Sequence, residues 1–199
     1  MALPINLIVG LGNPGARYAD TRHNAGFQFI DAIIGDLGTG LSPSTRFQGD
    51  IGQGSLQGHA VRLLAPNTFM NRSGAAVAQA VNFYKLALQQ VLVVHDELDL
   101  PPGTVRLKRG GGAGGHNGLR DIIDCLGSPD FLRLRIGIGH PGRASEVTNY
   151  VLRPAPAEEQ ELIEEAIQAA RRELPAIVSG DLERAMHALH SRDRPAPGA

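Results

Sequence analysis

The stretch INLIVGLGNPGARYADTRHNAGFQFIDAIIGDL, residues 5–37, decides the fold class. It begins with a short apolar run at 5–9, which predicts a buried strand, and continues into a glycine-rich turn. Apolar residues then recur at helical spacing from Asn24 to about Leu37. A strand, a polar loop and a helix in this order are typical of an α/β protein, in which sites gather where loops leave the carboxyl ends of strands.

The rest of the chain repeats this alternation of strands and helices. Further strands are expected at 61–64, 91–94, 104–108 and 131–139. Helices are expected from Asn71 or Ser73 onward, near 117–126, and around 162–170. The run at 91–94 is continuously apolar, which is typical of a strand covered on both faces. We therefore expect one α/β domain over residues 1–191, with a mostly parallel sheet covered by helices, and a disordered tail over 192–199.

Composition restricts the class of protein. The chain has 199 residues and a single cysteine, so it forms no internal disulfide and suits a reducing compartment. Its N-terminus has no basic region, and the apolar stretch there is too short to span a bilayer. We expect a cytoplasmic protein that does not associate with membranes.

Charge is unevenly distributed along the chain. The net charge is −1, which argues against indiscriminate binding of nucleic acid. Residues 103–143, however, carry seven Lys/Arg against three Asp/Glu, and residues 156–193 carry nine Asp/Glu against four Lys/Arg. This pattern fits a protein with one face that meets phosphates, although solvated surfaces alone would also produce it.

Four segments rich in small and polar residues are candidate site loops: Gly10–Gly26, Pro66–Gly74, His95–Gly103 and Gly110–Gly118. The first contains G-x-G-x-x-G, but the third glycine follows Pro14 and the helical pattern starts only after His23. A dinucleotide fingerprint requires that glycine within the opening helix. The glycine-rich fourth segment lacks the Gly-Lys-Ser/Thr of a P-loop. We therefore expect no nucleotide cofactor.

His23 and Asp96 are the candidate base and its supporting carboxylate. A lone loop histidine is often structural, but Asp96 directly follows the buried run that ends at Val94. A carboxylate there can orient an imidazole whose ordinary pKa of about 6.5 suits it to take a proton from water.

Two other chemistries are weaker on the same segments. A metal cluster of His95, Asp96, Glu97 and Asp99 is an alternative, but neighbours on an extended segment point to opposite sides. Covalent catalysis lacks a G-x-S-x-G elbow, and Cys125 is predicted to be a buried helix residue. We expect no metal.

Three asparagines, Asn13, Asn71 and Asn117, lie on the candidate loops. Each has a simple structural interpretation, Asn13 as a turn residue and the other two as helix N-caps. Together they would offer neutral donors and acceptors to backbone amides and ribose hydroxyls. Tyr18 and Phe69 add flat surfaces on which a base or a sugar can stack.

The sequence resembles the bacterial-type peptidyl-tRNA hydrolases. The resemblance runs from the first strand to roughly residue 190 and rests on five collinear blocks. They are LIVGLGNPGARYADTRHNAG (7–26), TFMNRSG (68–74), HDELDLPPG (95–103), GGHNGLRDII (114–123) and RLRIGIGHPG (133–142). The resemblance implies a single, usually monomeric α/β domain around a twisted mixed sheet. It also implies an enzyme that hydrolyses the ester between peptide and tRNA with a water activated by a histidine. A non-catalytic RNA-binding protein on the same scaffold is the alternative.

Residue roles follow from the same resemblance. His23 would be the catalytic base and Asp96 its partner, with His116 accessory. Asn13 would distinguish a blocked peptidyl group from a free aminoacyl group. The remaining implied contacts to substrate or tRNA are Tyr18, Phe69, Asn71 and Asn117 in the cleft, and Arg106, Lys108 and Arg135 on phosphates. Ala113 departs from the family, because some relatives carry a histidine there.

Overall fold

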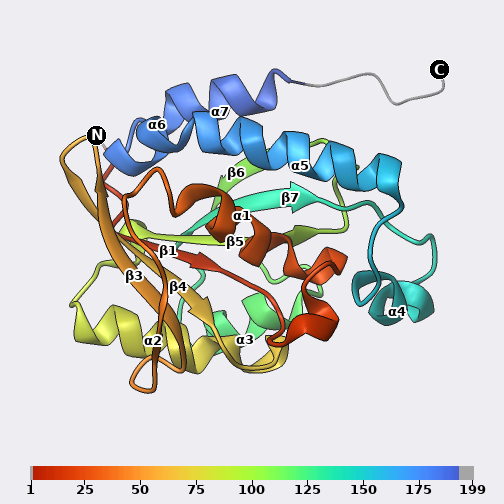
Figure 1. Ribbon diagram of the computed structural model, residues 1–199, viewed down its shortest axis with the longest axis horizontal. Helices are drawn as coiled ribbons and strands as arrows, with labels where there is room; N and C mark the ends of the chain where they lie inside the picture. Colours follow the sequence, from red (N-terminus) through yellow and green to blue (C-terminus); the bar gives the residue numbers. More distant parts are fainter. Residues whose placement is uncertain (1, 193–199) are drawn as a thin grey trace.

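A seven-stranded sheet lies between two layers of helices in the computed structural model, which describes residues 2–192 (Figure 1). The strands are β1 Leu7–Gly10, β2 Ser42–Ser44, β3 Gly49–Leu56, β4 His59–Pro66, β5 Val91–Glu97, β6 Val105–Arg109 and β7 Leu132–Gly137. The tail expected at 192–199 lies outside the described residues, apart from Arg192.

The sheet has the order β2-β3-β4-β1-β5-β7-β6. Its four central strands, β4, β1, β5 and β7, run parallel, whereas β2, β3 and β6 form antiparallel pairs toward the edges. Because β1 pairs with both β4 and β5, their carboxyl ends meet at one edge of the sheet. The expected mixed sheet is confirmed, with its parallel part in the centre.

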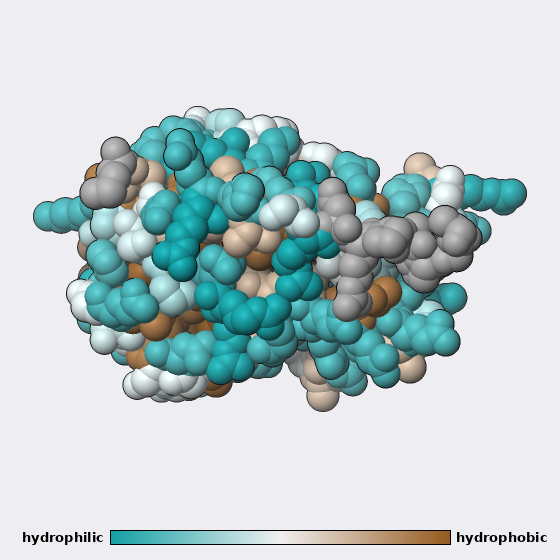
Figure 2. Space-filling view, turned by 90° about the horizontal axis from the view of Figure 1, so that it is seen from above, coloured by the Kyte–Doolittle hydropathy of each residue, from teal (hydrophilic) through white to brown (hydrophobic). Residues whose placement is uncertain are grey.

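Seven α-helices are present in the described residues: α1 Ala25–Ile33, α2 Ser73–Phe83, α3 Asn117–Leu126, α4 Val147–Val151, α5 Ala157–Arg172, α6 Leu174–Ser179 and α7 Leu182–His190. Helices α1, α5, α6 and α7 cover one face of the sheet, and α2 and α3 cover the other (Figure 1). The short helix α4 lies beyond the carboxyl ends of the central strands. The outer surface of the α5–α7 layer is largely hydrophilic (Figure 2).

Two glycines place the start of α1 directly against the sheet. A Cβ on Gly26 would lie 2.4 Å from the Val94 carbonyl oxygen, and one on Gly10 would lie 2.5 Å from the Gly26 oxygen. Only glycine permits this backbone-to-backbone contact. It fixes the 3-10 turn Arg22–Asn24, which precedes α1, beside the end of β5. Gly15 lies well before α1, which begins at Ala25, after His23 as the helical pattern predicted.

Several local predictions were wrong. Helix α2 begins at Ser73 with Asn71 in a preceding 3-10 turn, and His116, not Asn117, caps α3. Cys125 is exposed and not buried, although its Sγ lies beside Gly74 at the start of α2.

The fourth candidate loop leaves the sheet at the opposite edge from the other three. Strand β6 is antiparallel to β7, and its last residue, Arg109, pairs with Leu132 at the start of β7. The glycine-rich segment must therefore run back over β7 to bring His116 to the site. Within the described part of the chain, no helix is long and apolar enough to cross a membrane.

Candidate active site

A cleft of about 460 Å³ opens at the carboxyl edge of the central strands. Eight residues predicted for the site line it: Asn13, Tyr18, His23, Phe69, Asn71, Asp96, His116 and Asn117. They come from the ends of β1, β4 and β5 and from the start of α3. The structure thus brings together residues that lie more than 100 positions apart in the chain.

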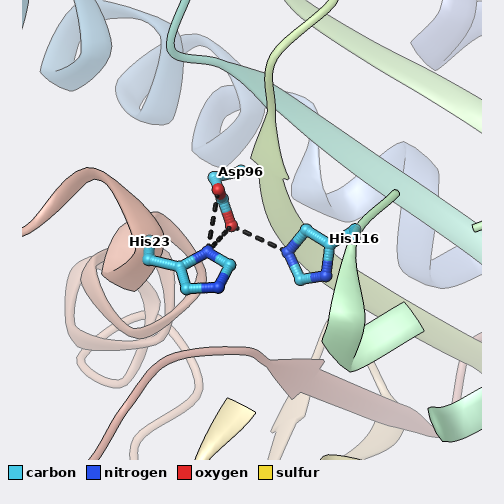
Figure 3. Close-up of side chains that lie close together, drawn as sticks. All are labelled: His23, Asp96 and His116. Carbon is cyan, nitrogen blue, oxygen red and sulfur yellow. Dashed lines mark hydrogen bonds and ion pairs between the residues drawn. The ribbon is translucent and has the colours of Figure 1, made fainter. Parts of the chain in front are cut away.

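Asp96 lies between two histidines at the floor of this cleft (Figure 3). His23 Nδ1 is 3.0 Å from both oxygens of its carboxylate, and His116 Nε2 is 2.8 Å from Oδ1. The three side chains are almost entirely buried. The two imidazole rings are 5.0 Å apart, centre to centre, so both act on a single carboxylate.

The hydrogen bonds define where the protons lie. Nδ1 of His116 accepts the backbone N–H of Leu119 as the N-cap of α3, so its Nε2 carries the proton and donates to Asp96. An ionised carboxylate only accepts, so His23 donates through Nδ1. The other ring nitrogen of His23 points away from Asp96 (Figure 3). In neutral His23 that nitrogen carries a lone pair.

Electrostatics stabilise the charged carboxylate and a charged His23. Burial would raise the pKa of Asp96, but the two histidines outweigh it and hold that pKa well below its ordinary value of 3.8. Burial would likewise lower the pKa of His23, and the charge and hydrogen bond of Asp96 raise it above 6.5. A histidine with a raised pKa is a stronger base toward water.

The donor atoms of His23, Asp96 and His116 lie within 4.8 Å of one another, close enough to share a metal ion. In the arrangement observed, both histidines instead donate N–H groups to the carboxylate. The metal cluster considered from the sequence, His95, Asp96, Glu97 and Asp99, is not the group whose ligand atoms lie close together. His95 is fully buried, and its Nδ1 donates to the Asp96 backbone carbonyl at 2.7 Å. Burial lowers the pKa of His95 to about 3 and keeps it neutral.

Asn13 is held by a residue that sequence reasoning missed. Its backbone N–H donates to Asn24 Oδ1 at 2.8 Å, and Asn24 Nδ2 returns a bond to the Asn13 carbonyl at 3.0 Å. The Oδ1 of Asn13 accepts the Met70 N–H at 2.8 Å. Because that oxygen is occupied, Asn13 offers the cleft mainly its NH₂ group. Asn24, adjacent to His23, fixes this orientation.

Asn71 and Asn117 differ from Asn13 in being exposed at the rim of the cleft. The Oδ1 of Asn117 accepts a bond from Arg120 at 3.4 Å, which turns its NH₂ group outward from that contact. Phe69 is also on the rim, with 60% of its surface exposed. These side chains are positioned to meet a ligand as it enters.

A wall of the cleft was not predicted. It consists of Leu98 and of residues on and next to α4: Ala144, Val147, Thr148, Val151 and Leu152. The turn that carries His23 holds this wall in place. Arg22 is buried, donates to the Tyr150 carbonyl at 2.9 Å, and lies 3.8 Å from the centre of the Tyr150 ring. The wall adds an apolar surface to an otherwise polar cleft.

The predicted phosphate contacts do not line the cleft. Arg106 and Arg135 pair across β6 and β7, and Lys108 pairs with Arg133 on the same strands. Arg135 donates to Glu97, a residue of the cleft, at 2.8 Å. These cations form a basic strip beside the site.

Comparisons with known proteins agree on one family. The sequence model described as Peptidyl-tRNA hydrolase matches residues 7–196. Proteins of that name from Saccharophagus degradans and Teredinibacter turnerae are each 58% identical, over 94% and 96% of this chain and 96% and 100% of their own. A crystal structure of peptidyl-tRNA hydrolase from Acinetobacter baumannii superposes with a TM-score of 0.91 at 50% identity, covering 93% of this chain and 94% of that one. The chain therefore belongs to the peptidyl-tRNA hydrolase family.

Proposed function

We propose that this protein hydrolyses the ester bond between peptide and tRNA in peptidyl-tRNA, and so returns the tRNA to use. The observation that carries the proposal is the buried Asp96 within hydrogen-bond distance of His23 Nδ1, in a cleft lined by three asparagines. Family membership supplies the substrate class.

His23 is the general base of this reaction. Asp96 holds its Nδ1–H, so Nε2 accepts a proton from water as the water oxygen attacks the ester carbonyl carbon. The resulting tetrahedral intermediate collapses, the bond to the ribose oxygen breaks, and the imidazolium returns its proton to that oxygen. Asp96 stabilises the imidazolium throughout. Neither an acyl-enzyme nor a metal ion takes part in this scheme.

The asparagines recognise the two halves of the substrate. The fixed NH₂ group of Asn13 donates to a peptide carbonyl, which a free aminoacyl group lacks. Asn71 or Asn117 donates to the oxyanion that develops on the ester carbonyl. Tyr18 and Phe69 stack against the end of the tRNA, and the wall around α4 receives apolar peptide side chains.

The basic strip contacts tRNA phosphates. Arg106, Lys108 and Arg135 lie on neighbouring strands beside the cleft without lining it, which suits contacts to the acceptor stem rather than to its end. The double variant Arg106→Ala plus Lys108→Ala should flatten the dependence of tRNA affinity on salt.

We further propose that the protein acts as a monomer in the cytoplasm.

Hydrolysis of N-acetyl-aminoacyl-tRNA tests the function directly. The wild-type protein should release tRNA, and His23→Ala should lower kcat by about 10²–10⁴-fold while tRNA binding persists. A chelator selective for transition metals, which spares the Mg²⁺ that folds tRNA, should leave the rate unchanged. Near wild-type turnover by His23→Ala would exclude this base.

The same assay separates the enzyme from a non-catalytic RNA-binding protein. Such a protein would bind tRNA with the expected salt dependence and leave the ester intact. Free aminoacyl-tRNA is the matched control substrate, because it presents the same ester without the blocked amine. Hydrolysis of both substrates at equal rates would contradict the role of Asn13.

A further inference from the structure

Arg133 is a buried cation on β7, beside the point where the glycine-rich segment leaves β6. The glycine-rich segment leaves β6 where Arg109 pairs with Leu132, whereas Asp96 pairs with Ile136 farther along β7. Four residues of strand separate these positions by ~13 Å. Residues 110–115 span at most ~20 Å when fully extended. The segment is thus longer than the separation that it must cover, so its length alone does not fix the path that brings His116 to Asp96.

The conformation of this segment contributes little rigidity of its own. Four of its glycines, Gly110, Gly111, Gly114 and Gly115, have positive φ angles, between 59° and 100°. Glycine reaches such angles freely and therefore also leaves them freely. The far end of the segment is fixed by His116, which bonds to Asp96 and caps α3. At the near end the Gly110 N–H donates to the Phe131 carbonyl at 3.0 Å, and the path beyond Gly110 requires a further anchor.

Arg133 supplies that anchor. Its Nη1 donates to the Gly112 carbonyl at 2.6 Å, and its Nη2 donates to the Gly111 carbonyl at 2.5 Å. Only 3% of its surface is exposed, and its guanidinium carbon lies 4.8 Å from the centre of the Phe131 ring. Among the described residues, no carboxylate forms an ion pair with it.

Burying a cation that forms no ion pair costs several kcal/mol, which the two bonds to Gly111 and Gly112 offset only in part, because the buried Nε of Arg133 has no hydrogen-bond partner among the described residues. An uncharged side chain such as methionine would fill the same volume without that cost. The planar fork of arginine is matched to two adjacent carbonyl oxygens, and the single point charge of a lysine is not. The contact therefore specifies the path of the main chain.

We propose that Arg133 is a positioning residue that fixes the start of the glycine-rich segment on β7, so that its far end delivers His116 to Asp96 and Asn117 to the cleft. The inference rests on the proposed function for its effect on rate, but its effect on the loop is independent of catalysis. Arg135, two residues along the same strand, bonds to Glu97 instead and provides a matched control.

Hydrogen exchange measures the anchor without reference to activity. In Arg133→Ala and Arg133→Lys, amides of residues 110–118 should exchange about 10-fold faster than in the wild type, and those of the central strands should not change. In Arg135→Ala the exchange of 110–118 should stay as in the wild type. Unchanged exchange at 110–118 in a folded Arg133→Lys protein would overturn the proposal.

Chemical rescue measures the catalytic consequence. Arg133→Ala removes the anchor, so kcat should fall about 10-fold and KM should change less than 3-fold. Because the substitution leaves a cavity shaped for guanidinium, millimolar ethylguanidinium should restore most of the rate. Arg133→Lys should show the defect without rescue. The anchoring role would be refuted if ethylguanidinium restored neither the rate of Arg133→Ala nor the slower hydrogen exchange of residues 110–118 in that variant. If the wild type hydrolyses no peptidyl-tRNA, the proposed function fails and the exchange experiment still decides the anchor.

Discussion

His23 and His116 bind the same carboxylate from opposite sides, but the chain supports them in different ways. His23 lies on a turn that the glycines at 10 and 26 pack directly against β1 and β5, with both neighbouring side chains, Arg22 and Asn24, buried in further contacts. His116 ends a glycine-rich segment that crosses back over β7 and is held at its start by Arg133.

The difference indicates a division of labour. A base must keep its geometry through every turnover, and the packed turn provides that rigidity. The glycine-rich segment lines the cleft at Gly114 and Gly115. Anchored only near its two ends, it can adjust between them without moving His23. Variants on the two sides should therefore differ in the size and kind of their effects.

Asp96→Asn should have the largest effect, because it removes the group that both sides share. An asparagine can offer an N–H to His23 Nδ1, which would leave the proton on Nε2 and block the base, so kcat should fall by about 10³-fold. Asp96 raises the pKa of His23, and burial alone lowers it. The wild-type rate should thus rise with pH through a pKa above 6.5, and the residual rate of Asp96→Asn through one below 6.5. An identical pH profile in the two proteins would contradict the pairing.

His116→Ala should have an intermediate effect with the opposite pH shift. Loss of the Nε2–H donor leaves Asp96 more basic, which favours the charged form of His23 and moves the acid limb of the pH–rate profile to higher pH. The rate near pH 7 should fall about 10-fold.

His116→Asn is the matched variant, since asparagine still caps α3 but is too short to replace the imidazole at Asp96. Equal rate losses in the alanine and asparagine variants would assign the effect to the bond with Asp96. Full activity of His116→Asn would assign it to the cap instead.

His23 and Asp96 could be paired from the sequence because both follow apolar runs that predict central parallel strands. The carboxyl ends of such strands lie at the same edge of the sheet. It did not allow the route of the glycine-rich segment to be predicted, because alternation in β6 is the same for a parallel and an antiparallel strand. The antiparallel pairing places the start of that loop at the opposite edge from the other three candidate loops.

Residues whose role is to hold others gave weaker signals. Arg22 lies in a polar loop and Arg133 alternates with apolar residues as an outward-facing strand residue would, and only the fold shows that both are buried against main-chain carbonyls. Asn24 acts through a bond to a residue 11 positions earlier, which no helical or strand period connects. The five-residue helix α4 is too short to produce an amphipathic pattern.

Arg22→Met should have the smallest effect on rate and sharpens the contrast with Arg133. Methionine keeps the apolar stem but removes the bond to the Tyr150 carbonyl and the contact with the Tyr150 ring, which should cost about 1–3 kcal/mol of unfolding free energy. The turn of His23 keeps its glycine packing and the bonds of Asn24, so kcat should fall less than about 3-fold. KM for substrates with a bulky apolar residue at the ester should rise more than KM for a glycine ester, because α4 lines the cleft. Denaturant unfolding and paired kinetics on the two substrates measure these effects.

A loss of kcat as large as that of Arg133→Ala would show that the His23 side depends on a single anchor too, and the proposed division of labour would then be wrong.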